Sequence, residues 1–175
     1  ARNGEVQRYE WHRRNRDGSL HWDQIVMKRV RLGGVDRLIS YSRDITDLKR
    51  REEALTQSED RLRATVEAAL DCIITMNADG RILGFNPAAE ECFGIHEEEA
   101  VGRRLSELII PERYRRAHER GMTRYLRDGS GPYLGRRIET WALRSDGTEF
   151  PIELAIGVAQ GAGGEIFIGY LRDIT

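Results

Sequence analysis

Residues 85–94 read FNPAAEECFG and predict the end of a strand, a short helix and a stop. Asn86 can cap the helix with its side-chain oxygen, and Pro87 suits the first helical position because its missing N–H has no intrahelical partner there. Gly94 then supplies a residue that adopts positive φ easily at a helix end. A short helix should therefore follow directly on a strand.

The regions on both sides of this stretch extend the pattern. Upstream, residues 72–85 read CIITMNADGRILGF, which predicts two strands around an Asn-Ala-Asp-Gly turn. Downstream, a short EEEAVG turn precedes a longer helix from Pro111 to about Asp128. This part of the chain therefore combines a hairpin with several helices, as in an α+β domain.

A three-strand segment occurs twice, with a constant offset of 129 residues. The stretch RDGSLHW (16–22) resembles SDGTEFP (145–151), and YSRDIT (41–46) resembles YLRDIT (170–175). In each copy an Asp-Gly pair and a second glycine turn mark hairpin connections, so each copy should form three antiparallel strands. Apolar residues alternate with other residue types over residues 150–156, which suits a sheet with one buried face.

The two copies differ in what precedes them. Residue 1 corresponds to residue 130, so we expect residues 1–46 to be the last three strands of a truncated domain and residues 71–175 to be a complete one. Between them, residues 47–70 contain no Pro or Gly and are rich in helix formers. This segment is expected to be a signalling helix that links the two.

The linker helix carries a heptad pattern with two acidic positions. Apolar residues recur every seven residues along it, which is typical of a coiled-coil seam. Like charges within a seam weaken the interface and leave it poised between arrangements. We therefore expect a homodimer through this helix, with the seam positions Ile45, Leu48, Glu52, Leu55, Glu59, Leu62 and Val66.

The composition argues against several classes of function. The chain of 175 residues carries 28 Lys and Arg against 29 Asp and Glu, and its net charge of −1 gives no field that favours nucleic acid or an anionic membrane. No apolar run approaches the ~20 residues that span a bilayer, and no signal peptide is seen, so we expect a cytoplasmic segment without membrane contact. Cys72 and Cys92 lack CxxC spacing, which predicts buried thiols rather than a disulfide or a metal site.

The ordered motifs resemble the PAS family of bacterial sensory domains. The resemblance rests on NADGRILGFNPAAEECFGIHEEEAVGRRLSELIIP (77–111), RSDGTEFPIELAI (144–156) and YLRDIT (170–175), and it covers about residues 60–175. It implies an α+β fold with a five-stranded antiparallel sheet and helices on one face, preceded by a long linker helix. Residues 1–46 resemble a three-stranded antiparallel fragment of a preceding PAS domain.

The resemblance also implies a role for the closing Asp-Ile-Thr. In PAS domains this motif joins the last strand to the outgoing helix, and its Asp and Thr make polar contacts that couple strand position to helix position. The corresponding residues for signal relay are Asp44, Thr46, Asp173 and Thr175. An ordinary helix cap would use the same residue types, so both interpretations stay open here.

The sequence contains no motif for catalysis. GAGG (161–164) lies between two predicted strands and lacks the helix that a dinucleotide-binding loop requires, so it is interpreted as a hairpin loop. We expect a non-catalytic module for sensing, signal relay and dimerisation in a bacterial multi-PAS protein, with a sensor histidine kinase as the first choice of parent. The alternatives are the sensor part of a cyclic-dinucleotide cyclase and a haem- or flavin-binding sensor of gas or redox state.

The sequence leaves the cofactor open, because PAS relatives hold haem, flavin, small acids or no ligand. Neither cysteine stands in the Asn-Cys-Arg-Phe-type motif of flavin-adduct photosensors. One face of the predicted long helix carries Tyr114, His118, Met122 and Tyr125 and should lie over the sheet. His118 is the candidate iron ligand, since a neutral imidazole can bind iron. Just before Gly135, where haem-binding relatives show a histidine, this chain has Tyr133, a poor substitute.

A small molecule in an internal pocket is the other expected partner. PAS domains hold such ligands between the sheet and its covering helices, and the ligand depends on which apolar residues line a cavity and which fill it. The residues expected at this pocket are Ile74, Met76, Leu108, Met122, Leu126, Trp141 and Ile156.

Overall fold

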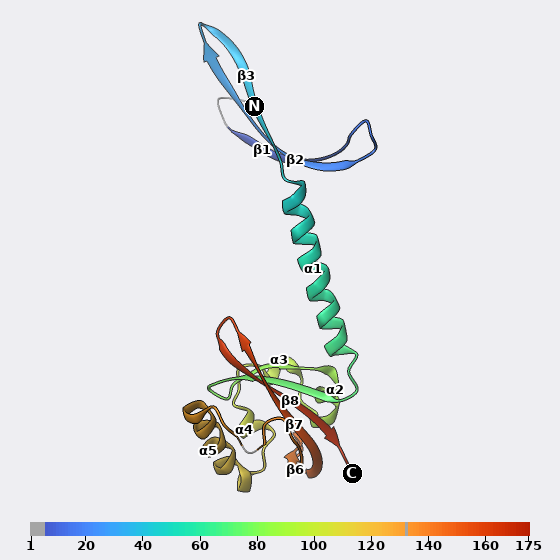
Figure 1. The fold of residues 1–175 in the computed structure, drawn as a ribbon, viewed down its shortest axis with the longest axis vertical. Helices are drawn as coiled ribbons and strands as arrows, with labels where there is room; N and C mark the ends of the chain where they lie inside the picture. The colour runs from blue at the N-terminus through green and yellow to red at the C-terminus, as the bar shows by residue number, and fades with distance from the viewer. Residues whose placement is uncertain (1–5, 132) are drawn as a thin grey trace. The chain divides into compact units, whose positions relative to one another are not determined.

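The computed structural model describes residues 6–131 and 133–175, and the chain falls into two compact units. Unit 1 spans residues 1–62 and unit 2 spans residues 63–175. Each unit has its own antiparallel sheet, with three strands in unit 1 and five in unit 2 (Figure 1).

Unit 1 is built on a three-stranded meander in the order β1-β2-β3. An Asp-Gly turn joins the first two strands: Gly18 adopts a φ of 85°, and its amide donates to the Asn15 carbonyl oxygen at 3.0 Å. Every residue of β1 and β3 is exposed, and burial is confined to the region around Asp23 and Ile45. The strands are β1 (Gln7–Arg14), β2 (Leu20–Leu32) and β3 (Val35–Asp44).

Helix α1 (Thr46–Glu67) begins directly after β3 and runs through the segment predicted as a helical linker, residues 47–70. It ends one turn earlier than expected. The amide of Ala69 already bonds the Val66 carbonyl oxygen at 3.3 Å, which is the tighter bonding typical of a fraying last turn. No residue of α1 is buried.

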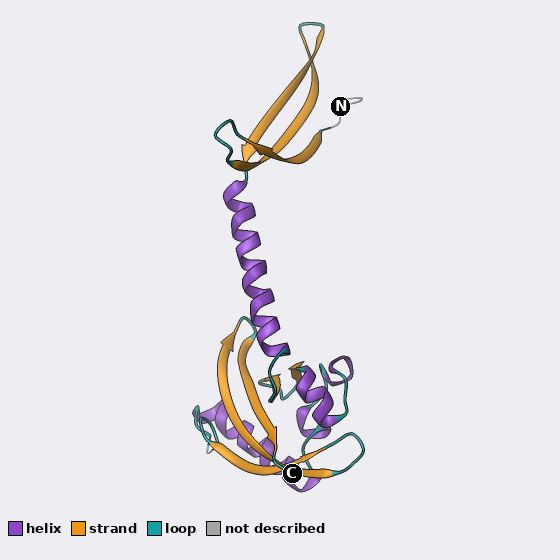
Figure 2. Ribbon diagram, turned by 90° about the vertical axis from the view of Figure 1, so that its right-hand side faces the viewer, coloured by secondary structure: helices purple, strands orange, loops and turns teal. Residues whose placement is uncertain are grey.

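Unit 2 contains a five-stranded antiparallel sheet in the order β5-β4-β8-β7-β6. The long hairpin of β7 and β8 curves past the helices (Figure 2). The strands are β4 (Cys72–Asn77), β5 (Ile82–Phe85), β6 (Arg137–Leu143), β7 (Glu149–Gly161) and β8 (Gly164–Asp173). This arrangement confirms the predicted α+β fold.

The short helix predicted from residues 85–94 is confirmed. Asn86 caps it by accepting a hydrogen bond from the Ala89 amide at 3.1 Å, and Gly94 ends it with a φ of 66°. The helices of unit 2 are α2 (Pro87–Phe93), α3 (Glu97–Ala100), α4 (Leu105–Leu108) and α5 (Glu112–Asp128).

The core of unit 2 joins the sheet to α2, α3 and α4. Phe93, which is fully buried on α2, lies at its centre. Its ring packs against Phe85 and Phe150, with centroids 5.9 Å and 5.6 Å away. Aromatic rings buried in this way contribute strongly to folding, so α2 fixes the fold of this part of the unit.

The repeat of 129 residues also holds in strand pairing. Arg14 faces Leu20 in unit 1, and Leu143 faces Glu149 in unit 2. The second hairpin of each copy shows the same offset. The predicted correspondence between the two copies is therefore confirmed residue by residue.

Candidate functional site

Unit 2 contains a cavity of about 700 Å³. One wall is helix α5, and the facing walls come from strands β4, β6, β7 and β8. Apolar side chains make up most of the lining, with a few polar groups among them. A cavity of this size and character suits a small, mainly apolar molecule.

Helix α5 lines the cavity with the face expected from its sequence. Tyr125 is held in place from two sides: its hydroxyl donates to Glu165 Oε1 at 3.2 Å, and its ring meets Phe167 edge-on with centroids 5.1 Å apart. The expected residues on this face that line the cavity are Tyr114, His118, Met122 and Tyr125.

His118 is the polar group of greatest chemical interest in the cavity lining. Its side chain is largely buried, and its Nδ1 atom has no hydrogen-bond partner among the described residues. Burial lowers the pKa of His118, because a charged imidazole would be desolvated there. His118 is therefore a neutral imidazole with a ring nitrogen free for a ligand.

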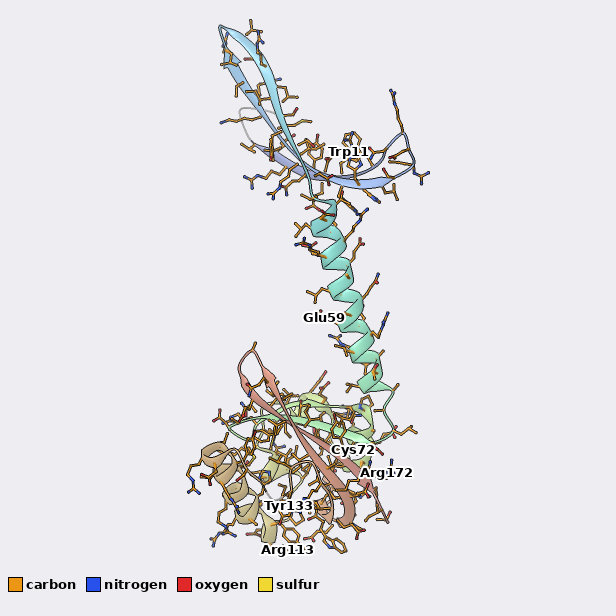
Figure 3. The ribbon with its side chains drawn as sticks, viewed as in Figure 1. Trp11, Glu59, Cys72, Arg113, Tyr133 and Arg172 are labelled. Carbon is orange, nitrogen blue, oxygen red and sulfur yellow. The ribbon has the colours of Figure 1, made fainter. Side chains whose placement is uncertain are left out.

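Tyr133 also lines the cavity, from the loop between α5 and β6 (Figure 3). Its side chain is 54% exposed, in contrast to the largely buried His118. The structure brings both candidate cofactor ligands to one cavity, with His118 inside and Tyr133 at the rim.

Two of the residues expected at the pocket lie elsewhere. Leu108 is buried within the core, and Leu126 is 48% exposed, and neither lines the cavity. Successive helix residues are about 100° apart, so the face centred near Tyr125 turns Leu126 away. The expected residues that do line the cavity are Ile74, Met76, Met122, Trp141 and Ile156.

Strand β8 forms a wall of the cavity that the sequence reasoning missed. Phe167, Gly169 and Leu171 lie at alternate positions of the strand and all line the cavity. Alternate residues of a strand point to the same face, so the spacing of these residues in the sequence could have predicted a shared face, which continues to Asp173. The cavity wall therefore belongs to the strand that ends in the Asp-Ile-Thr motif.

The Asp-Ile-Thr motif at the end of β8 is tied to Arg144, the residue that follows β6. Asp173 Oδ2 binds Arg144 Nη2 at 2.5 Å, and its Oδ1 accepts from the Thr175 amide at 2.9 Å. Burial opposes ionisation of Asp173, but hydrogen bonds from Thr175 and Arg144 outweigh it and lower its pKa. Asp173 is thus a carboxylate that joins β8 to the end of β6.

The equivalent motif in unit 1 makes a similar local turn. The Thr46 amide donates to Asp44 Oδ1 at 2.8 Å, and Thr46 Oγ1 accepts from the Trp22 amide at 2.9 Å. Hydrogen bonds from Thr46 lower the pKa of Asp44. These contacts fasten the first turn of α1 to strand β2.

Within unit 2, Asn86 holds the last turn of α1. Its Nδ2 donates to the carbonyl oxygens of Val66 and Asp71 at 3.2 Å and 3.1 Å, and its Oδ1 accepts from the Ile73 amide at 2.8 Å. Asp71 also forms a two-pronged ion pair with Arg172 of β8, with contacts of 2.9 Å and 3.1 Å. One buried side chain thus connects the incoming helix, β4 and α2.

The predicted dimer seam lies on an exposed helix. Leu48, Leu55 and Leu62 are 54%, 61% and 66% exposed, and Glu52, Glu59 (Figure 3) and Val66 are exposed as well. Ile45 differs, because it is buried within unit 1 and has no surface left for a partner. The exposed stripe available for a second copy therefore begins at Leu48.

Among the residues that the structure describes, no helix has both the length and the apolar composition that crossing a membrane requires. In the same part of the chain, no three His, Cys, Asp or Glu side chains gather closely enough to hold a metal ion.

Comparison with known families identifies the fold. The family described as the PAS fold matches residues 60–174, which cover all five strands of unit 2. A crystal structure of the PAS domain of an HTR-like protein from Haloarcula marismortui superposes with a TM-score of 0.58 at 26% identity. The match covers 72% of this chain and 99% of that one.

Two curated relatives are signalling proteins by name. The sensor protein FixL of Bradyrhizobium diazoefficiens is 37% identical over 135 residues, which are 75% of this chain and 26% of FixL. The cell-division control histidine kinase PdhS of Brucella ovis is 29% identical over 128 residues, which are 71% of this chain and 12% of PdhS. The chain therefore spans about a quarter or less of these relatives.

Proposed function

This chain belongs to the PAS family, and we propose that unit 2 is a sensory domain whose cavity holds a small, mainly apolar ligand. Ligand binding changes the position of β8 and so of the Asp-Ile-Thr joint at its end. Helix α1 carries signals between PAS domains and dimerises through its exposed seam. The segment itself is a relay without catalytic activity.

The observation that carries this proposal is the cavity with one unpartnered nitrogen. A cavity of about 700 Å³ with mostly apolar walls is costly to leave without contents, since its lining loses packing contacts. A buried polar atom without a partner costs a further ~1–3 kcal/mol. A ligand with an apolar body and one polar group facing His118 Nδ1 would remove both costs.

Strand β8 connects the ligand cavity to the Asp-Ile-Thr motif. Phe167, Gly169 and Leu171 contact the cavity, and Asp173 is the next residue on the same face of β8. A shift of the strand on ligand binding therefore moves the carboxylate that Arg144 holds. The ion pair of Asp71 with Arg172 ties the segment between α1 and β4 to β8.

For the parent protein we propose a sensor histidine kinase. The support is the similarity to the histidine kinase PdhS and to the sensor protein FixL. In that setting the segment would be an internal sensor and relay between other domains.

The ligand is tested by mass spectrometry of material released when the purified protein is denatured, with Gly121 variants as controls. Gly121 lines the cavity, and an added Cβ would meet nothing within 4 Å. Gly121→Ala should keep the ligand and stabilise the helix by about 0.5–1 kcal/mol. Gly121→Phe fills the cavity and should lose the ligand. A wild-type protein that releases nothing beyond the Gly121→Phe background would contradict the proposal.

Haem in the same cavity is the second candidate, and the observation that favours it is the neutral, buried His118. A visible absorption spectrum of protein from haem-supplemented cells tests it. Haem bound through His118 should give a strong visible band that His118→Ala abolishes. A sample that stays colourless after haem titration would rule haem out and leave the apolar ligand.

The dimer seam is tested with charge variants of α1. Replacing Glu52 and Glu59 with Leu removes like charges from the seam and should strengthen dimerisation at least about tenfold. The matched control replaces Glu53 and Asp60 with Leu. These exposed acidic residues directly follow Glu52 and Glu59 in the sequence, and their replacement should leave dimerisation nearly unchanged. Sedimentation equilibrium measures both. Equal effects of the two double variants on the dimerisation constant would contradict the assignment of Glu52 and Glu59 to the seam.

A further inference from the structure

Two cysteines meet where α2 packs on β4. Cys72 opens β4 and is 4% exposed, whereas Cys92 is half-buried in the last turn of α2. Cys72 Sγ lies 3.5 Å from the carbonyl oxygen of Ala88, which stands one helical turn before Cys92. Cys72 therefore reaches the helical turn that contains Cys92, and both cysteines are free thiols. Neither lines the cavity.

Arg144 places a positive charge beside Cys92. Its Nη1 lies 3.9 Å from Cys92 Sγ and also donates to the Cys92 carbonyl oxygen. Its Nη2 binds Asp173 Oδ2 at 2.5 Å. The guanidinium also lies over the Phe150 ring, 3.8 Å from the centroid. Arg144 therefore contacts a thiol and the carboxylate of the Asp-Ile-Thr joint at the same time.

The two thiols differ in chemistry. A hydrogen bond from Cys72 lowers the pKa of Cys92 to about 7, helped by the charge of Arg144 and opposed by burial and by Asp173. The same hydrogen bond, together with burial, raises the pKa of Cys72. Because the thiolate is the nucleophile, Cys92 is the reactive member and Cys72 its protonated neighbour.

We propose that Cys72 and Cys92 form a peroxide-responsive thiol pair, connected through Arg144 to the Asp-Ile-Thr joint. In the first step the Cys92 thiolate attacks one oxygen of hydrogen peroxide. An S–O bond forms, the O–O bond breaks, and the leaving hydroxide takes a proton from solvent and becomes water. Cys92 is then a sulfenic acid, oxidised by two electrons, and the peroxide is reduced by two.

In the second step the Cys72 sulfur attacks the Cys92 sulfur. The S–S bond forms and the S–OH bond breaks. The hydroxide leaves as a second water with the proton that Cys72 gives up. In sum, two thiols and one hydrogen peroxide become one disulfide and two waters.

Oxidation alters the surroundings of the joint. It removes the negative charge that Arg144 faces at Cys92, so the guanidinium loses one of its partners beside Asp173. A covalent bond also replaces the packing contact between β4 and α2. The thiol pair therefore gives unit 2 an oxidation input that does not depend on the ligand cavity.

The test is peptide mapping of the purified protein after treatment with hydrogen peroxide. Trypsin places the cysteines in separate peptides, residues 64–81 and 82–103. The expected result is a cross-linked pair of these peptides from a single chain, which disappears on reduction. Two free thiols after treatment, or a cross-link only between chains, would overturn the proposal.

Single variants separate the roles of the two cysteines. In Cys72→Ser, Cys92 should stop at the sulfenic acid, which a dimedone reagent captures. In Cys92→Ser, Cys72 should react at least about tenfold more slowly, because its burial still disfavours the thiolate. Equal reaction of the two variants would overturn the assignment of Cys92 as the nucleophile. Amide exchange at residues 171–175 should rise on oxidation, and an unchanged rate would disprove the connection through Arg144.

Discussion

The two copies of the three-strand segment share one register but differ in burial. At an offset of 129 residues, Leu38 of β3 corresponds to Phe167 of β8. Leu38 is 59% exposed, whereas Phe167 is 3% exposed. Hydrogen-bonded strand pairing alone therefore gives a sheet without a core. Helices α2 to α5 are what turn the same strands into a domain with a cavity.

The two copies also differ in chemistry at positions that unit 2 uses for its core. Where unit 2 has apolar residues, unit 1 has Arg13, His21 and Asp23. Asp23 Oδ2 lies 2.8 Å from Arg13 Nε and 3.2 Å from His21 Nε2, and Asp23 is 7% exposed, against 3% for its counterpart Ile152. A buried carboxylate requires such partners. At this position unit 1 therefore buries a carboxylate paired with Arg13, whereas unit 2 buries an apolar side chain.

The largest expected effect on stability concerns Phe167, which is buried where its counterpart Leu38 is exposed. Phe167→Ala should lower the free energy of unfolding of unit 2 by about 3–5 kcal/mol, because it leaves a void beside Tyr125 and the cavity. The matched variant Leu38→Ala should cost less than about 0.5 kcal/mol, because its side chain is exposed. The loss in each variant is measured by unfolding in denaturant, with hydrogen exchange reporting on each unit separately. Similar losses would contradict the difference in burial.

An intermediate loss of stability is expected at Asn86, which caps α2 and bonds to the segment after α1. Asn86→Ala should destabilise unit 2 by about 2 kcal/mol, since it removes the helix cap and the bonds to Val66, Asp71 and Ile73. Asn86→Ser keeps a capping oxygen and should recover about half of that loss. Thermal unfolding compares the two. A serine variant no better than alanine would show that the cap contributes little.

The smallest expected change in stability comes from Arg144→Asn. This substitution places in unit 2 the residue that unit 1 has at the equivalent position, Asn15. Arg144→Asn loses a partly exposed ion pair with Asp173 and the contacts with the Cys92 carbonyl oxygen and the Phe150 ring, so the free energy of unfolding should fall by about 1 kcal/mol. The pKa of Cys92 should rise from about 7, because a positive charge is lost while Cys72 and Asp173 remain. The thiolate then forms only at higher pH.

The rate of alkylation by iodoacetamide, measured against pH, checks this shift. In the wild-type protein the rate should increase as pH rises through about 7, and in Arg144→Asn the midpoint should move to higher pH. Arg144→Lys keeps the charge and should stay closer to the wild type. A midpoint that does not move in Arg144→Asn would contradict the role given to the guanidinium.

Most of the fold could be predicted from the sequence because the signals are local. Asn86, Pro87 and Gly94 specify helix α2 from within the stretch 85–94, and the Asp-Gly turns set the hairpins. The repeat then fixed the register of both copies. Such features depend on backbone conformation near each residue, which the local order of residues indicates.

The candidate site was harder to predict because it depends on packing between distant segments. Whether Leu126 or its neighbour Tyr125 faces the cavity follows from the rotation of α5 on the sheet, which the sequence does not state. The approach of Arg144 to Cys92, 52 residues away in the chain, has no local signal either. The burial of Ile45 likewise follows from how β2 meets the start of α1.

Amide hydrogen exchange in the two copies, measured within the same molecule, tests most directly whether covering helices, rather than strand pairing, give the second copy its core. Amides of β7 and β8 should exchange at least about a hundredfold more slowly than those at the equivalent positions of β2 and β3. Equal exchange rates at positions 129 residues apart would contradict the claim.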